Sequence, residues 1–139
     1  MKAELECGMA AGFLGSGRAL ANCGNCAALA GAGGVLLADT VAARALFAAA
    51  VVCWPAVCYF GMRVAIDARL FEELQREPVE GGAALDEWLR ERGLANAKPG
   101  RSIGERSRGA LRLWRRLLAA VAIQMAAALA GVLVEAWSR

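Results

Sequence analysis

Three runs of the chain contain no charged side chain, and most of the charge lies between the second and the third. The runs cover residues 19–38, 45–62 and 117–134. A helix of about 20 apolar residues crosses the hydrocarbon core of a bilayer, which is roughly 30 Å thick. The pattern therefore predicts an all-α integral membrane protein with three transmembrane helices, or with two if the first run does not span.

The first run is the least apolar of the three. It contains Asn22 and Asn25, and glycine is frequent in it and just before it, which lowers both its hydropathy and its helix propensity. Small residues also let transmembrane helices approach one another closely. We expect an N-terminal segment 1–18 and then a transmembrane helix 19–38 packed against the second helix. The alternative is a re-entrant or interfacial stretch.

The second helix is predicted to continue past the lipid, over residues 41–76. Ile66, Leu70 and Leu74 are spaced i, i+4 and i+8, which is typical of one apolar helix face. Pro55 lies within the uncharged run and lacks a backbone donor, so it predicts a kink.

The third helix is predicted over residues 102–137 and starts well before its own uncharged run. Helices 2 and 3 would therefore extend together into a helical hairpin outside the membrane. The linker 77–101 contains a short predicted helix, 83–92, whose apolar face includes Trp88. We expect this short helix to cap the hairpin.

The distribution of charged residues predicts how the chain is oriented in the membrane. Of its 16 Lys and Arg residues, 12 lie within 63–116, together with 9 of the 13 Asp and Glu residues. Basic loops are retained on the cytoplasmic side, so residues 63–116 are predicted to be cytoplasmic. The content of Ala, Gly and Arg favours a bacterial source, which makes the predicted location the bacterial inner membrane. The basic excess is small and acids are interleaved with it, which argues against nucleic acid as a partner.

The cytoplasmic segment supplies the candidate interaction residues. Antiparallel packing of the two long helices would place Asp67 near Arg112. It would also place Glu72 and Glu73 near Arg106 and Arg108, so that acidic residues of one helix meet basic residues of the other. The arginines fit an anchor to anionic lipid headgroups. The alternative is a docking site for a soluble protein. The candidate residues are Asp67, Arg69, Phe71, Trp88, Arg108 and Arg112.

Cys23 and Cys26 form a C-x-x-C pair, a spacing that can ligate metal or cycle as a dithiol. Antiparallel packing would place Cys23 at the depth of Cys58, and Cys26 near Cys53. However, no strand precedes the pair, and free cysteine is common as a small buried residue. The pattern favours packing, with no metal or cofactor.

Polar residues within the predicted spans are few: Asn22, Asn25 and Gln124. Such groups usually turn toward protein, where a neighbouring helix can share a hydrogen bond. A substrate path would require more of them than this chain contains.

The chain has no histidine and none of the common catalytic motifs. We therefore expect a non-enzymatic small subunit or scaffold that presents its cytoplasmic hairpin to a protein partner or to a second copy. One alternative is a membrane thiol protein that uses Cys23 and Cys26. Another is a small oligomeric channel or transport element.

Overall fold

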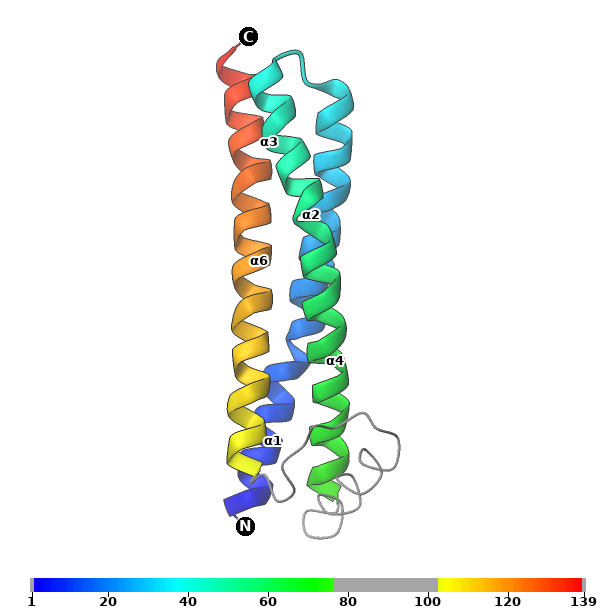
Figure 1. Cartoon of the computed structure of the whole chain (residues 1–139), viewed down its shortest axis with the longest axis vertical. Coiled ribbons are helices and arrows are strands. Elements are labelled where there is room, and N and C mark those ends of the chain that lie inside the picture. Colours follow the sequence, from blue (N-terminus) through cyan, green and yellow to red (C-terminus); the bar gives the residue numbers. More distant parts are fainter. Residues whose placement is uncertain (1, 77–102, 139) are drawn as a thin grey trace.

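The computed structural model describes residues 2–76 and 103–138, and helices account for nearly all of them. The elements are α1 (Lys2–Gly15), α2 (Gly17–Leu37), α3 (Val41–Val52), α4 (Trp54–Arg76) and α6 (Ile103–Trp137). They lie side by side in one rod, with the N-terminus beside the start of α6 and the C-terminus beside the α2–α3 turn (Figure 1). The predicted linker 77–101, its helix 83–92 and Trp88 lie outside the described residues.

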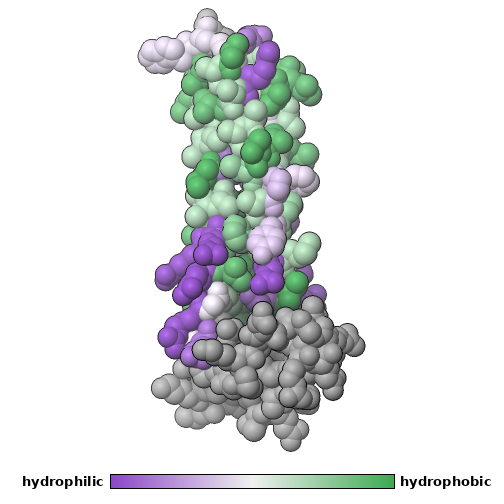
Figure 2. All heavy atoms as spheres, viewed as in Figure 1, coloured by the Kyte–Doolittle hydropathy of each residue, from purple (hydrophilic) through white to green (hydrophobic). Residues whose placement is uncertain are grey.

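Three stretches are long and apolar enough to cross a membrane. They are Gly8–Leu37, Val41–Glu72 and Ser107–Trp137. The expectation of three membrane-spanning helices is therefore met by length and composition, and the glycine-rich first stretch is one of them. On the face shown in Figure 2, hydrophobic side chains cover the upper part of the rod and hydrophilic ones gather toward its lower end.

Two of the three long helices are interrupted. The first is interrupted at Ser16, whose backbone N–H and hydroxyl both donate to the Phe13 carbonyl oxygen, at 3.2 and 2.6 Å. The second is interrupted at Cys53, between α3 and α4. Pro55 follows two residues later and cannot donate a backbone hydrogen bond. The helix is therefore broken near the position where the sequence predicted a kink.

Buried positions recur every seven residues in all three long helices. One such series is Gly17, Gly24 and Gly31 in α2; Ala50, Val57, Val64 and Phe71 in α3 and α4; and Ala110, Leu117, Gln124 and Gly131 in α6. A seven-residue repeat keeps one seam of each helix facing its neighbours when the helices coil gently around each other. The molecule is therefore a three-stranded antiparallel bundle, and the interruptions do not break its repeat.

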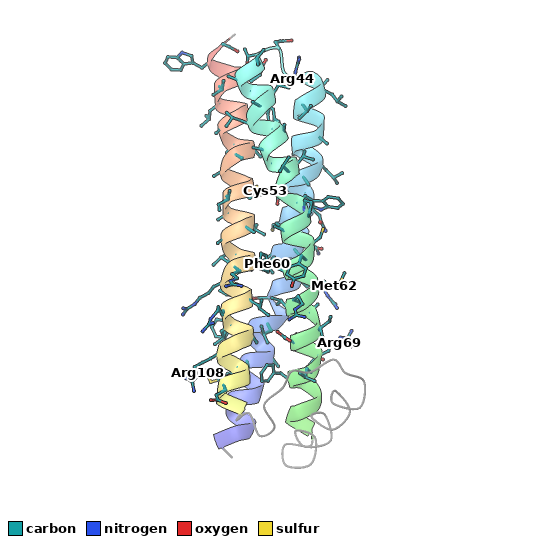
Figure 3. All side chains as sticks on the ribbon, viewed as in Figure 1. Arg44, Cys53, Phe60, Met62, Arg69 and Arg108 are labelled. Carbon is teal, nitrogen blue, oxygen red and sulfur yellow. The ribbon has the colours of Figure 1, made fainter. Side chains whose placement is uncertain are left out.

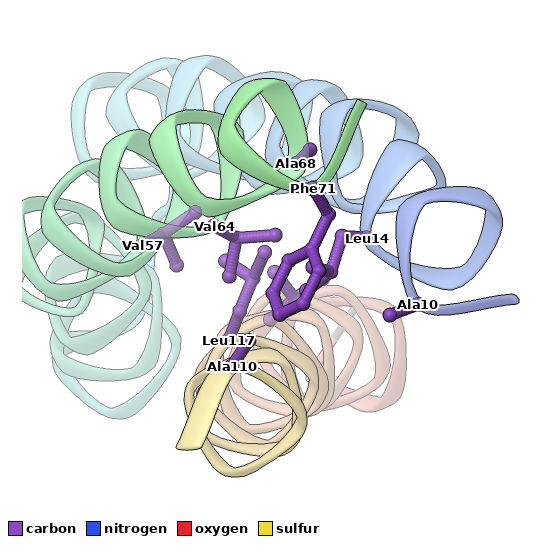
Figure 4. Packing of buried hydrophobic residues seen from close by; sticks show 9 residues of the cluster. Ala10, Leu14, Val57, Val64, Ala68, Phe71, Ala110 and Leu117 are labelled. Carbon is purple, nitrogen blue, oxygen red and sulfur yellow. The ribbon is translucent and has the colours of Figure 1, made fainter. Parts of the chain in front are cut away.

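One end of the rod carries Arg69 of α4 and Arg108 of α6, and we call this charged end the base. The base has an apolar core of its own. Figure 4 shows Phe71 and Val64 of α4, Leu14 of α1 and Leu117 of α6 pointing into the space between these helices. Phe71 is 2% exposed and Leu14 is 1% exposed. The N-terminal segment, to which the sequence assigned no structure, thus forms the third helix of the base.

The buried face of α4 differs from the predicted one. Val64, Ala68 and Phe71 are buried, whereas Ile66 is 58% exposed and Leu70 is only half-buried. The seven-residue series fixes the rotation of α4 from Val57 onward, and a position two residues away lies about 200° round the helix. The spacing of Ile66 and Leu70 was helical, but it marked the wrong face.

The far end of the rod is closed by hydrogen bonds to Glu135 near the end of α6. Its Oε2 atom accepts from the Asp39 backbone N–H at 3.2 Å and from the Thr40 hydroxyl at 3.3 Å. The same Thr40 hydroxyl accepts from the Ala43 backbone N–H at 3.2 Å and so caps α3. The α2–α3 turn is thereby fixed to the third long helix.

Candidate functional site

The base carries an exposed arginine surface. On α6, four exposed arginines are spaced so that they share one side of the helix: Arg108, Arg112, Arg115 and Arg116. Arg63 and Arg69 are exposed on α4, and Arg18 is exposed on α2. Figure 3 shows Arg69 and Arg108 near the same end of the rod, on different helices. This end therefore presents cationic groups on several sides.

The predicted interaction residues do not form one patch. Arg69, Arg108 and Arg112 are exposed, and Asp67 is half-buried. Phe71 lies in the core of the base, where its ring packs among the helices and is not offered to a partner. A docking surface on the described residues would consist of arginines rather than of an aromatic anchor.

Asp67 forms no ion pair with Arg112, and Glu72 forms none with Arg108. The side chains of Glu73 and Arg106, which were predicted to lie in the same region, are outside the described residues. Contacts in the bundle place Val64 at the level of Leu117. This register puts Asp67 closer in depth to Trp114 than to Arg112, and Arg112 is on the exposed side of α6. The cationic group that acts on the Asp67 carboxylate is Arg63, one turn earlier on the same helix.

Cys23, Cys26, Cys53 and Cys58 are free thiols. Cys23, Cys26 and Cys58 are exposed on the outside of the bundle, and Cys53 is half-buried. Contacts of Gly24 with Val57 put Cys23 and Cys58 at the same depth. Nevertheless, no three cysteine or carboxylate side chains of the described residues are close enough together to hold a metal ion.

Gln124 is the buried polar side chain of the bundle interior. It is 0% exposed, and a Cβ on Gly24 would lie 3.1 Å from its Oε1 atom and 2.6 Å from Val57 Cγ1. Its amide was expected to share a hydrogen bond with a neighbouring helix, but neither its nitrogen nor its oxygen has a partner among the described residues. Its neighbours include Gly24, which has no side chain, and the apolar residues Val57 and Val121. The backbone groups of the helices form hydrogen bonds within their own helix.

The two asparagines of the first span are on the outside instead. Asn25 Oδ1 accepts from Trp54 Nε1 at 2.9 Å, which satisfies two polar groups on the outer surface of α2 and α4. Asn22 is also exposed. The two asparagines therefore do not converge with Gln124 on a common path.

Trp114 makes a contact that the sequence did not reveal. Its Nε1 donates to the Ser16 hydroxyl at 3.2 Å, and its ring meets Phe13 edge to face with ring centroids 6.2 Å apart. This contact joins the α1–α2 bend to α6. The only sequence signal was a tryptophan near the edge of an uncharged run, which is typical of a membrane interface.

Compared with models of protein families, with curated proteins and with solved structures, the chain matches none. The bundle, its exposed arginines and its buried amide are therefore the basis for any functional proposal.

Proposed function

We propose that this protein is a non-enzymatic subunit or scaffold of the bacterial inner membrane that presents the charged base of its helical bundle to a cytoplasmic protein partner. The observation that carries the proposal is the continuous core. Apolar packing runs from the membrane-spanning part into the base, where α1, α4 and α6 surround Phe71. The base is thus a folded platform, not a pair of free helix ends.

The character of the base supports a partner that carries negative charge. Arg69, Arg108 and Arg112 are exposed and held on helices whose opposite faces are buried. Such arginines lose little additional backbone freedom when they bind, and the guanidinium matches carboxylates in two-point hydrogen bonds. An acidic surface of a soluble protein fits this arrangement best.

The orientation follows from the same charges. Arginines near membrane ends are retained on the cytoplasmic side, so the base would lie in the cytoplasm and the Glu135 end outside it. A C-terminal alkaline phosphatase fusion is expected to be active, and a C-terminal green fluorescent protein fusion to be dark. The reverse pattern would put the base outside the cell and contradict the proposal.

The partner is tested by site-specific photo-crosslinking in intact cells. A benzophenone amino acid at Arg69 or Arg112 is expected to give a discrete adduct with a second protein. The matched control positions are Leu129 and Val52, which are 59% and 77% exposed but lie within the uncharged runs 117–134 and 45–62. These should give no such adduct with a soluble protein.

Two results would contradict the proposal. Adducts at the base that contain only a second copy of this chain would make it a homo-oligomer, and the absence of any adduct at both base positions would leave no partner to present to. A charge reversal, R69E with R112E, should abolish the adduct formed at Arg108 while leaving the protein in the membrane fraction.

A further inference from the structure

A cavity of about 330 Å³ lies in the base between the α1–α2 bend and α4. Its walls include the buried side chains of Leu14 and Ala68, which belong to the apolar core. Arg18, Arg69 and Glu72 also line it, and all three are exposed. The cavity therefore combines an apolar floor with a charged rim.

Its position along the helices matches the edge of a bilayer. Arg18 directly precedes the first uncharged run, and Arg69 follows the second run, which ends at Met62, by seven residues. Seven residues of helix span about 10 Å. The headgroup layer on each side of the hydrocarbon core is roughly 5 to 8 Å thick, so the cavity extends from Arg18 at the inner edge of that layer to Arg69 just beyond its outer edge.

The charged groups of the rim have no partner among the described residues. Within the part of the chain that the structure describes, Arg18, Arg69 and Glu72 make neither an ion pair nor a hydrogen bond. Two guanidinium groups beside one carboxylate leave a net charge of +1 at the rim. A ligand with one negative charge would balance it.

We propose that this cavity binds the headgroup of an anionic phospholipid. Arg18 and Arg69 hold the phosphate, because a guanidinium donates paired hydrogen bonds to phosphate oxygens. Glu72 accepts hydrogen bonds from headgroup hydroxyls, and the apolar floor of Leu14 and Ala68 contacts carbon atoms of the headgroup. A glycerol-bearing headgroup such as that of phosphatidylglycerol supplies the single charge and the hydroxyls together.

The lipid site depends on the membrane placement and not on a protein partner. A free phosphate ion would share the arginine contacts but would leave the apolar floor exposed to water. The two sources of phosphate therefore differ in what they bury, and competition between them distinguishes the two.

The test uses the full chain, purified in mild detergent and titrated with phosphatidylglycerol while bound lipid is counted by native mass spectrometry. The double variant R18Q/R69Q is expected to bind at least about tenfold more weakly, since each charge-assisted hydrogen bond lost costs on the order of a factor of ten. The matched control is R112Q/R115Q, which removes the same charge from the outer side of α6 at the same end. Its affinity should stay close to that of the wild type.

A second variant fills the cavity without changing charge. Gly15 lines the cavity, and a Cβ built there meets nothing within 4 Å, so G15L is expected to fold. It should lose lipid binding to a similar extent as R18Q/R69Q while keeping the wild-type unfolding temperature.

Three results would overturn the lipid site. Equal losses in R18Q/R69Q and R112Q/R115Q would show diffuse attraction to the whole base. Equal binding of phosphatidylcholine and phosphatidylglycerol would show that the net charge of the headgroup is not recognised. Displacement of the lipid by an equal concentration of glycerol phosphate would show a site for soluble phosphate. Arg69 is shared with the proposed partner surface, so photo-crosslinking at Arg112, which lies outside the cavity, is the partner test that does not depend on these results.

Discussion

The two ends of the bundle are packed by different side chains. In the base, the core includes the large side chains of Phe71, Leu14 and Leu117, almost fully buried, together with three alanines, Ala10, Ala68 and Ala110. Toward the far end, Phe47 of α3 lies directly against Gly34 and Gly131. The large side chain there fills a space that two glycines leave open.

The difference follows from the solvent on each side. In water, burying apolar surface contributes roughly 25 cal/mol per Å², so a large buried side chain is directly stabilising. Lipid is as apolar as a leucine side chain, and helices in it associate through close packing and small residues instead. One seven-residue repeat thus serves both regions, with Phe71 and Leu117 buried in the base and Phe47 packed on glycines toward the far end.

The largest effect is expected from removing the central ring of the base. Phe71→Ala should lower the free energy of unfolding by about 3 to 5 kcal/mol, through lost burial and the cavity it leaves. Denaturant titration in mixed micelles, followed by tryptophan fluorescence, measures it. Ile66→Ala is the control on the same helix, because Ile66 is exposed and should change stability little. Equal losses would mean that the two faces of α4 are not distinguished.

The second-largest effect is expected where Gly34 of α2 packs on Phe47 of α3. Gly34→Ala would place a Cβ 2.5 Å from Cδ1 and Cδ2 of Phe47, whereas Gly33→Ala meets nothing within 4 Å. The first should destabilise by about 1 to 3 kcal/mol through overpacking. The second should be neutral or slightly stabilising, since alanine favours helix over glycine. The same titration compares these neighbouring residues, and a reversed order would contradict the described packing of α2 on α3.

A substitution of Gln124 tests whether its buried amide has a hydrogen-bond partner in the folded protein. Because its amide has no partner among the described residues, Gln124→Met should stabilise the bundle by about 1 to 3 kcal/mol. Unfolding of the variant and of the wild type in the same micelles measures this. A clear loss of stability would instead show that the amide has a partner, which would favour the alternative of a channel or transport element.

The smallest effect is expected at the far end. Thr40→Ala removes the hydroxyl that caps α3 and donates to Glu135, and should cost about 1 kcal/mol. Thr40→Ser keeps the hydroxyl and should restore most of that stability. Thermal unfolding of the two variants side by side measures the cap. If alanine and serine behave alike, the cap contributes nothing.

Much of the architecture could be predicted from the chain alone. The uncharged runs gave three span-length helices, because the spacing of charges is a strong signal when lipid is the solvent. Pro55 gave the interruption of the second helix through its missing donor.

Less of the candidate site could be predicted from the sequence. Phe71 was expected at a docking surface, but the rotation of α4 is set by glycine contacts with helices far away in sequence, and local periodicity does not report them. The role of residues 2–15 was missed for a similar reason. Small and apolar residues are spread around α1, so only its contacts with α4 and α6 reveal which face is buried.

If the protein is a membrane bundle, lipid surrounds the upper part of the rod and water surrounds its base. Spin labels at Arg112, Ile123, Gln124 and Leu129, in a background whose native cysteines are changed to alanine, test this in reconstituted vesicles. A water-soluble relaxation agent should reach the label at Arg112, oxygen dissolved in lipid should reach those at Ile123 and Leu129, and neither should reach the label at Gln124. If the water-soluble agent reached Ile123 and Leu129 as readily as Arg112, the protein would not be a membrane bundle.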